Sequence, residues 1–134
     1  MPDRSILFEE LKTPQDIFAL KEHLRELYRL LDKRFVNVTF SATPTFDSDE
    51  GDVFLITLTA NITGITLKNA YQGRTITILF KQGGVGGYTI AWTTIVKLAG
   101  AVAIGPDAVG EYSTITLTYD GTNWVEIGRT ADVK

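Results

Sequence analysis

The sequence has no cysteine, only one histidine and no excess of positive charge. Without cysteine, the chain cannot form a disulfide framework, a thiolate metal site or a cysteine nucleophile. With His23 as the only histidine, a Ser-His-Asp triad or a metal site with several histidine ligands is hard to assemble. The formal net charge of −3 gives no positive field for polyanions, so we expect no nucleic-acid partner.

Long hydrophobic runs are also missing. No run approaches the roughly 18 to 20 apolar residues that cross a bilayer, and the first residues lead into charged sequence rather than the core of a signal peptide. We therefore expect synthesis in the cytoplasm and no membrane insertion. Apolar residues still make up 44% of the 134 residues, which is enough for one hydrophobic core and a short appendage.

Residues 13–34 have the pattern of a helix that associates with other helices. Thr13 can cap this helix, Pro14 suits its first position, and Asp16 stands where a capping-box acid lies. Apolar residues then recur at alternating spacings of three and four, the repeat of a coiled-coil seam. The seam consists of Ile17, Leu20, Leu24, Leu27 and Leu31.

An isolated helix of this length is marginal in water, so the seam needs an apolar partner. One candidate partner is the chain's own β region, since an apolar stripe on a helix is most often ordinary core. The other is the same helix in sister chains. The narrow, leucine-rich repeat stands wholly N-terminal to the β region, and we therefore favour association between copies.

From residue 35 to the end, the sequence alternates with the period of β-strands. Val36, Val38 and Phe40 alternate with polar residues, and no helical pattern intervenes afterwards. Asp120-Gly121 is a strong hairpin signal. Further strands are predicted at residues 54–59, 65–68, 75–82, 88–92, 95–98, 113–119 and 124–129. Short strands, tight turns and no crossover helices predict a mainly β fold, an antiparallel β-sandwich of jelly-roll type over residues 35–134.

Acidic residues are dense in one turn, at Asp47, Asp49, Glu50 and Asp52. Such a turn could wrap a Ca²⁺ ion, but it lacks the full EF-hand pattern, and a solvated turn explains it equally well. Hydrolysis of a polysaccharide through Asp49 or Asp52 would need two acids facing each other across a groove, which one local cluster does not provide. We predict no catalytic residue, no resident metal and no cofactor, and whether this turn binds Ca²⁺ stays open.

Aromatic residues flank the glycine-rich stretch at residues 83–87. It lacks the ending of a phosphate-binding loop, and no helix is predicted to follow it, so we expect a flexible hairpin turn here. Amphipathic rings suit sugar surfaces, and Tyr88 and Trp92 are therefore candidate glycan contacts. The alternative for both is packing within the core.

The β region resembles a domain found in structural proteins of tailed bacteriophages, including tail fibres, head fibres and related trimeric surface proteins. Residues 56–62, 73–92 and 117–124 carry the resemblance, including the hairpin sequence Tyr-Asp-Gly-Thr-Asn-Trp. It implies a jelly-roll-like module exposed on the virion, typically as a trimer. It also implies structural roles for Gly73 and Gly121 at turns and for Trp92 and Trp124 as packing anchors.

On this resemblance we expect a non-enzymatic structural protein of a phage particle. It would be a homotrimeric head-fibre or decoration protein, or a tail-fibre-type surface protein. Residues 13–34 would assemble the trimer and residues 35–134 would be displayed. Residues 1–12 would attach it to a capsid or tail protein of the virion, through the apolar residues Ile6, Leu7, Phe8 and Leu11. A locally packed or disordered terminus is the alternative. The rival function is a glycan-binding module of a phage fibre that recognises the host surface.

Overall fold

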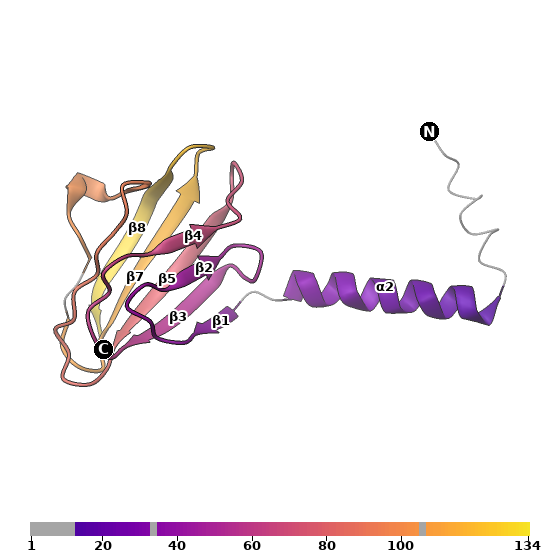
Figure 1. Ribbon diagram of the computed structural model, residues 1–134, viewed down its shortest axis with the longest axis horizontal. Coiled ribbons are helices and arrows are strands. Elements are labelled where there is room, and N and C mark those ends of the chain that lie inside the picture. The colour runs from indigo at the N-terminus through magenta and orange to yellow at the C-terminus, as the bar shows by residue number, and fades with distance from the viewer. Residues whose placement is uncertain (1–12, 33–34, 105–106) are drawn as a thin grey trace. The chain divides into compact units, whose positions relative to one another are not determined.

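The computed structural model describes residues 13–32, 35–104 and 107–134, and the chain divides into two compact units, Met1–Lys33 and Arg34–Lys134. The described part of the first unit is helix α2 (Pro14–Asp32), whereas the second unit is mainly β (Figure 1). Its elements are β1 (Phe35–Val38), β2 (Thr45–Asp47), β3 (Val53–Leu58), β4 (Thr66–Lys68), β5 (Thr75–Gln82), β6 (Val96–Lys97), the 3₁₀ helix η1 (Ala99–Ala101), β7 (Tyr112–Tyr119) and β8 (Trp124–Val133). The prediction of a mainly β chain is confirmed.

Helix α2 begins with the predicted capping box. The Thr13 hydroxyl accepts a hydrogen bond from the Asp16 backbone amide at 3.1 Å, and the Asp16 carboxylate accepts one from the Thr13 amide at 3.2 Å. These two bonds satisfy backbone donors that an uncapped helix end leaves without partners. The Asp16 carboxylate also lies at the positive end of the helix dipole. The start of the helix is therefore determined locally, by the four residues from Thr13 to Asp16.

The second unit is built from two sheets. Six strands form one sheet in the order β1-β3-β5-β7-β8-β6, and β2 pairs with β4 in a smaller one. From β1 to β5 the chain alternates between the two sheets, so that β1, β3 and β5 are parallel neighbours in one sheet while β2 and β4 are parallel in the other. This winding resembles the stacked coils of a solenoid. Strand β7 pairs in antiparallel fashion with β5 on one side and with β8 on the other, and β6 pairs in parallel with β8 at the far edge.

The predicted antiparallel β-sandwich of jelly-roll type is therefore wrong, because the main sheet is mixed. We expected parallel pairing to require helical crossovers. Residues 39–52 and 59–74 connect the parallel strands instead, and each crossover carries a strand of the small sheet. These connections exceed the dozen residues that a parallel crossover needs. A three-residue strand such as β2 is too short to show a periodic pattern in the sequence.

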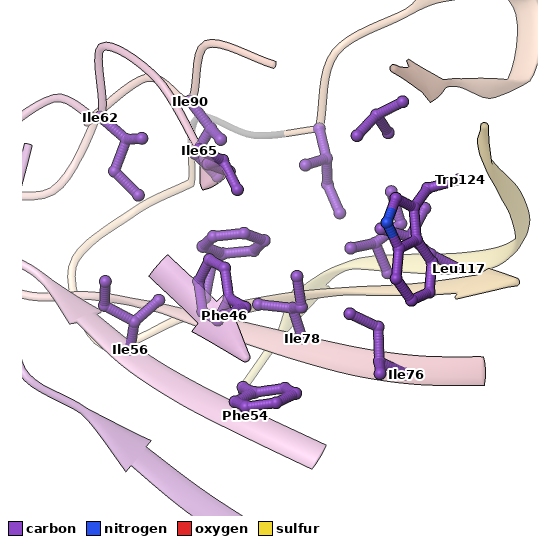
Figure 2. Packing of buried hydrophobic residues seen from close by; sticks show 14 of the residues in the cluster. Phe46, Phe54, Ile56, Ile62, Ile65, Ile76, Ile78, Ile90, Leu117 and Trp124 are labelled. Carbon is purple, nitrogen blue, oxygen red and sulfur yellow. The ribbon is translucent and has the colours of Figure 1, made fainter. Parts of the chain in front are cut away.

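The hydrophobic core lies between the six-stranded sheet and the layer that contains β2 and β4 (Figures 1 and 2). Phe46 of β2 is fully buried, and its ring packs edge-on against Phe54 of β3 at 5.5 Å and Phe80 of β5 at 6.3 Å between centroids. Aromatic pairs prefer such edge-to-face contacts. Trp124 is fully buried against Tyr119 at 5.2 Å. The small sheet thus covers the parallel strands through one aromatic cluster.

The two predicted hairpins have different outcomes. The turn at Asp120-Gly121 does join antiparallel strands, with Tyr119 paired to Trp124, and Gly121 has a φ of 102°. The glycine-rich stretch at residues 83–87 does not form a hairpin, because residues 88–92 contribute only an isolated bridge between Ile90 and Ile62. A Cβ at Gly86 would lie 2.5 Å from the Val109 backbone nitrogen. The glycines there permit close backbone packing.

Candidate functional site

The seam residues of α2 form an exposed apolar row along the described part of the helix. Ile17, Leu20, Leu24 and Leu27 expose 44%, 36%, 43% and 52% of their surface. Leu31 belongs to α2, but its side chain lies outside the described residues. Since single exposed apolar residues are ordinary, the informative feature is that four of them repeat along one face. The arrangement can pack against another helix of the same pattern.

Two further features accompany this seam. A shallow hollow beside Leu20 is lined by Asp16, Ala19 and His23, all on α2. Residues at these spacings enclose the kind of hole that receives a side chain of a packed helix. On the water-exposed surface, Glu22 and Arg25 form an ion pair at 2.6 Å, which adds only a few tenths of a kcal/mol, about 0.3 to 0.5. His23 therefore lies beside the seam residue Leu20.

Of the candidate glycan contacts Tyr88 and Trp92, Trp92 lines the shallow pocket described below and Tyr88 does not. The Tyr88 hydroxyl accepts a hydrogen bond from the Val85 amide at 3.5 Å, over the glycine stretch. Trp92 packs edge-on against Phe80 at 5.8 Å and lines a shallow pocket. The other lining residues are Thr93, Thr94, Val96, Lys97, Leu98 and Ala101. The Trp92 indole nitrogen is buried and has no hydrogen-bond partner in the described part of the chain.

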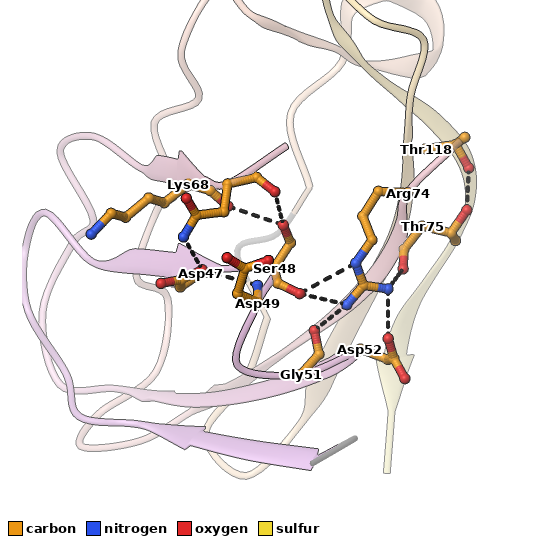
Figure 3. A network of polar contacts seen from close by, with 10 residues as sticks. Asp47, Ser48, Asp49, Gly51, Asp52, Lys68, Arg74, Thr75 and Thr118 are labelled. Carbon is orange, nitrogen blue, oxygen red and sulfur yellow. Dashed lines mark hydrogen bonds and ion pairs between the residues drawn. The ribbon is translucent and has the colours of Figure 1, made fainter. Parts of the chain in front are cut away.

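Hydrogen bonds and an ion pair connect the acidic turn to neighbouring parts of the chain (Figure 3). Asp47 accepts hydrogen bonds from the Asn69 side chain at 2.7 Å and from the Asp49 amide at 2.9 Å, and these bonds lower the pKa of Asp47. Asp52 forms an ion pair with Arg74 at 2.5 Å. The guanidinium of Arg74 also donates to the carbonyls of Ser48 at 2.7 Å and Gly51 at 2.6 Å. Arg74 thus holds the turn against the start of β5, and Asp47 joins it to Asn69 at the end of β4.

A second group of carboxylates was not found from the sequence. Asp107, Glu111 and Asp132 each place one oxygen within 4.8 Å of the others. Asp107 accepts a hydrogen bond from Ser113, and Lys134 lies 3.6 Å from Glu111. The pKa of Asp132 is raised, first by its hydrogen bond with Asp107, then by burial and by the negative charges of Asp107 and Glu111. Three oxygens are fewer than the six to eight that Ca²⁺ takes, and Mg²⁺ prefers near-octahedral coordination.

No local motif could have revealed these three carboxylates. They meet because the pairing of β7 with β8 brings Tyr112 beside Val133, and sequence analysis does not provide that register. By contrast, helix α2 and its cap were readable from the sequence, since both depend on neighbours within one or two turns, whereas the seam stays a prediction. The predicted attachment residues Ile6, Leu7, Phe8 and Leu11 lie outside the described residues.

Comparison with protein-family models found no match, and comparison with curated proteins found none either. The resemblance to tailed-phage proteins therefore stays a prediction from sequence patterns. In the part of the chain that the structure describes, no helix combines the length and the hydropathy needed to cross a membrane.

Proposed function

We propose that this chain is a non-enzymatic structural protein of a bacteriophage particle, a homotrimeric surface protein of the head-fibre, decoration or tail-fibre type. In this proposal α2 assembles three copies and the β unit is displayed. Residues 1–12 attach the trimer to a capsid or tail protein. Three such attachment segments on one trimer would bind with raised effective concentration, so each segment alone can be weak.

The observation that carries the proposal is the exposed seam on a well-capped helix. A helix of 19 residues is marginal in water by itself. Leu20, Leu24 and Leu27 are each more than one-third exposed. Burying a leucine side chain stabilises by about 1.5 to 3 kcal/mol. Three helices that bury these leucines between them would therefore offset the cost of ordering each helix.

The assembly is tested by sedimentation equilibrium of the full chain. We expect the mass of a trimer, and we expect monomers when Leu24→Asp and Leu27→Asp are combined. Because aspartate also lowers helix propensity, Leu24→Ala with Leu27→Ala is the stricter variant, since alanine favours helix more than leucine does. It should dissociate too. Phe18→Asp, at a residue that is 63% exposed and off the seam, is the control and should leave the mass unchanged.

The two parts of the proposal can fail separately. A seam variant that remains trimeric would contradict the role of α2. A trimer that antibodies against this chain do not detect on purified phage particles, by immunoelectron microscopy, would contradict the place on the virion. Labelling of heads or of tails would distinguish a head-fibre or decoration protein from a tail-fibre protein.

A further inference from the structure

The shallow pocket beside Trp92 has a volume of about 300 Å³, at the lower end of the range for small-molecule sites. Its lining residues all lie between positions 92 and 101, so one short segment forms its described wall. Trp92 and Leu98 are partly buried and Val96 is buried. The apolar lining residues are Trp92, Val96, Leu98 and Ala101, and the polar ones are Thr93, Thr94 and Lys97.

Contacts with β8 hold this segment in place. The Glu126 carboxylate accepts a hydrogen bond from the Ala99 amide at 3.2 Å and is ion-paired with Arg129. The Arg129 guanidinium also donates to the Val102 carbonyl at 2.8 Å. Ala101, which lines the pocket, has a φ of 56°, and a non-glycine residue keeps this conformation only where its surroundings fix it. The wall of the pocket is therefore fixed by the fold itself.

Lys97 is the one charged residue among those that line the pocket. Its ammonium donates to the Thr94 carbonyl at 2.9 Å, and no acidic side chain of the described residues pairs with it. A lysine ammonium has three donors, so this bond leaves donors for another acceptor. The carboxylate of Glu126 is already paired with Arg129. The pocket thus offers one positive charge beside an apolar wall.

Two further donors at the pocket have no partner. The indole nitrogen of Trp92 and the hydroxyl of Thr93 are buried and lack a hydrogen-bond partner in the described part of the chain. A third such atom, the Trp124 indole nitrogen, belongs to a residue that does not line the pocket. Buried polar groups are almost always hydrogen-bonded, so unpartnered donors point to an acceptor from outside the chain. A ligand oxygen would reach these buried atoms only after a small shift of the wall.

We infer that this pocket binds a small apolar carboxylate, with its apolar body on Trp92 and Leu98 and its carboxylate beside Lys97. A carboxylate only accepts hydrogen bonds, which complements the donors of the pocket. A sugar ring fits less well, because its several hydroxyls need several exposed partners, whereas the exposed polar residues of the lining are Thr94 and Lys97. The inference concerns the β unit alone and does not depend on assembly through α2.

The test uses phenylacetate as the probe and phenylacetamide, a neutral molecule of nearly the same shape, as its control. Two-dimensional proton–nitrogen NMR of the full chain gives an indole signal for each of the two tryptophans, and Trp92→Phe identifies that of Trp92. At neutral pH we expect phenylacetate to shift the Trp92 signal saturably in the millimolar range, since so small a ligand gains little affinity. Phenylacetamide should bind about threefold more weakly, as expected for the loss of an exposed charge pair.

Lys97→Gln tests the contribution of the charge. It should weaken phenylacetate binding about threefold, to the level of phenylacetamide, whose own binding should not change. Lys68→Gln removes the same charge at an exposed residue outside the pocket and should leave both affinities unchanged. The backbone amide signals of each variant show whether it folds.

Three results would overturn the inference: no saturable shift with phenylacetate, equal affinity of the wild type for acid and amide, or equal losses in the two lysine variants. A shift with methyl α-glucoside and none with phenylacetate would assign the pocket to a neutral sugar instead. None of these results bears on the mass of the assembly, so the failure of this inference and the failure of the proposed function are distinguishable.

Discussion

The parallel half of the β unit (β1, β3 and β5) and its antiparallel half (β7 and β8) differ in how far apart in the sequence the paired strands lie. In the antiparallel half, β7 and β8 are joined by a short turn, and Asp120 closes this turn by accepting bonds from the amides of Thr122 at 2.8 Å and Asn123 at 2.6 Å. In the parallel half, β1, β3 and β5 meet only after the chain has passed through the small sheet. The antiparallel strands β7 and β8 are therefore joined by a local turn. The parallel strands depend on contacts between segments that are distant in the sequence.

This difference also appears on the surface. The antiparallel half has one buried face and one face of hydrogen-bonded threonines, which is the usual alternation of a half-solvated sheet. On the outer face of the parallel half, the apolar residues Phe35, Val53, Leu55 and Leu79 stand beside the polar residues Asn37, Thr57, Thr77 and Lys81. The two halves therefore share one buried core face and differ in topology and in the residues that they expose on the outer face. The following predictions test how far the two halves are independent.

The largest expected effect is the loss of Phe46, which anchors the small sheet on the parallel strands. Phe46→Ala leaves a cavity between Phe54 and Phe80, and we expect the free energy of unfolding to fall by about 3 to 5 kcal/mol. Chemical denaturation measures this loss. Tyr71→Ala, at a residue that is 58% exposed, is the control and should cost little.

Hydrogen exchange shows which half the Phe46 variant weakens. We expect the amides of β1 and β3 to exchange faster while those of β7 and β8 keep their protection, since local opening follows cooperative segments. If amide exchange accelerates equally in all of these strands, the two halves unfold as one unit. They would then differ in topology but not in stability.

A smaller effect is expected at Arg74, which holds the crossover of residues 39–52 against β5. Its side chain is 13% exposed, and it donates to the carbonyls of Ser48 and Gly51. Arg74→Met would leave these carbonyls without their partner, at a cost of about 1 to 3 kcal/mol by denaturant titration. Asp52→Asn removes only the half-exposed ion-pair partner and should cost less than about 1 kcal/mol. Equal losses would assign the effect to the ion pair rather than to the carbonyls.

Local features of the fold could be predicted from the sequence. The capping box of Thr13 and Asp16 and the heptad spacing identify α2, and the turn at Asp120-Gly121 identifies the hairpin of β7 and β8. Each depends on residues that are close in the sequence. The role of the seam residues in assembly stays a prediction.

The orientation of the other strands could not be predicted from alternation alone. Alternation shows which residues face inward and does not show which strand lies beside which. The small sheet was missed because β2 offers only three residues, although Phe46 is central to the core. The apolar run at residues 53–56 was a readable signal for parallel pairing. The predicted alternation of this strand is confirmed, since Phe54, Ile56 and Leu58 are buried and the residues between them are not, but alternation alone does not distinguish parallel from antiparallel pairing.

The smallest predicted effect lies at the end of the antiparallel half, at Asp132. Its pKa in the folded chain is raised, chiefly by the hydrogen bond with Asp107. The stability that protonated Asp132 contributes is therefore fully present below its unfolded pKa and is lost as pH rises through the folded pKa. Asp132→Asn should raise the melting temperature slightly at neutral pH, with a difference that shrinks in acid.

Asp120, in the turn before β8, is expected to have the opposite effect on the pH dependence of stability. The amides of Asn123 and Thr122 lower its pKa, so its contribution is present above the unfolded pKa and is lost as pH falls through the folded pKa. Asp120→Asn should lower the melting temperature at neutral pH and converge with the wild type in acid. Thermal unfolding monitored by circular dichroism across this pH range compares the two variants. Shifts of the same sign would show that net charge alone, and not these contacts, governs the pH dependence of the antiparallel half.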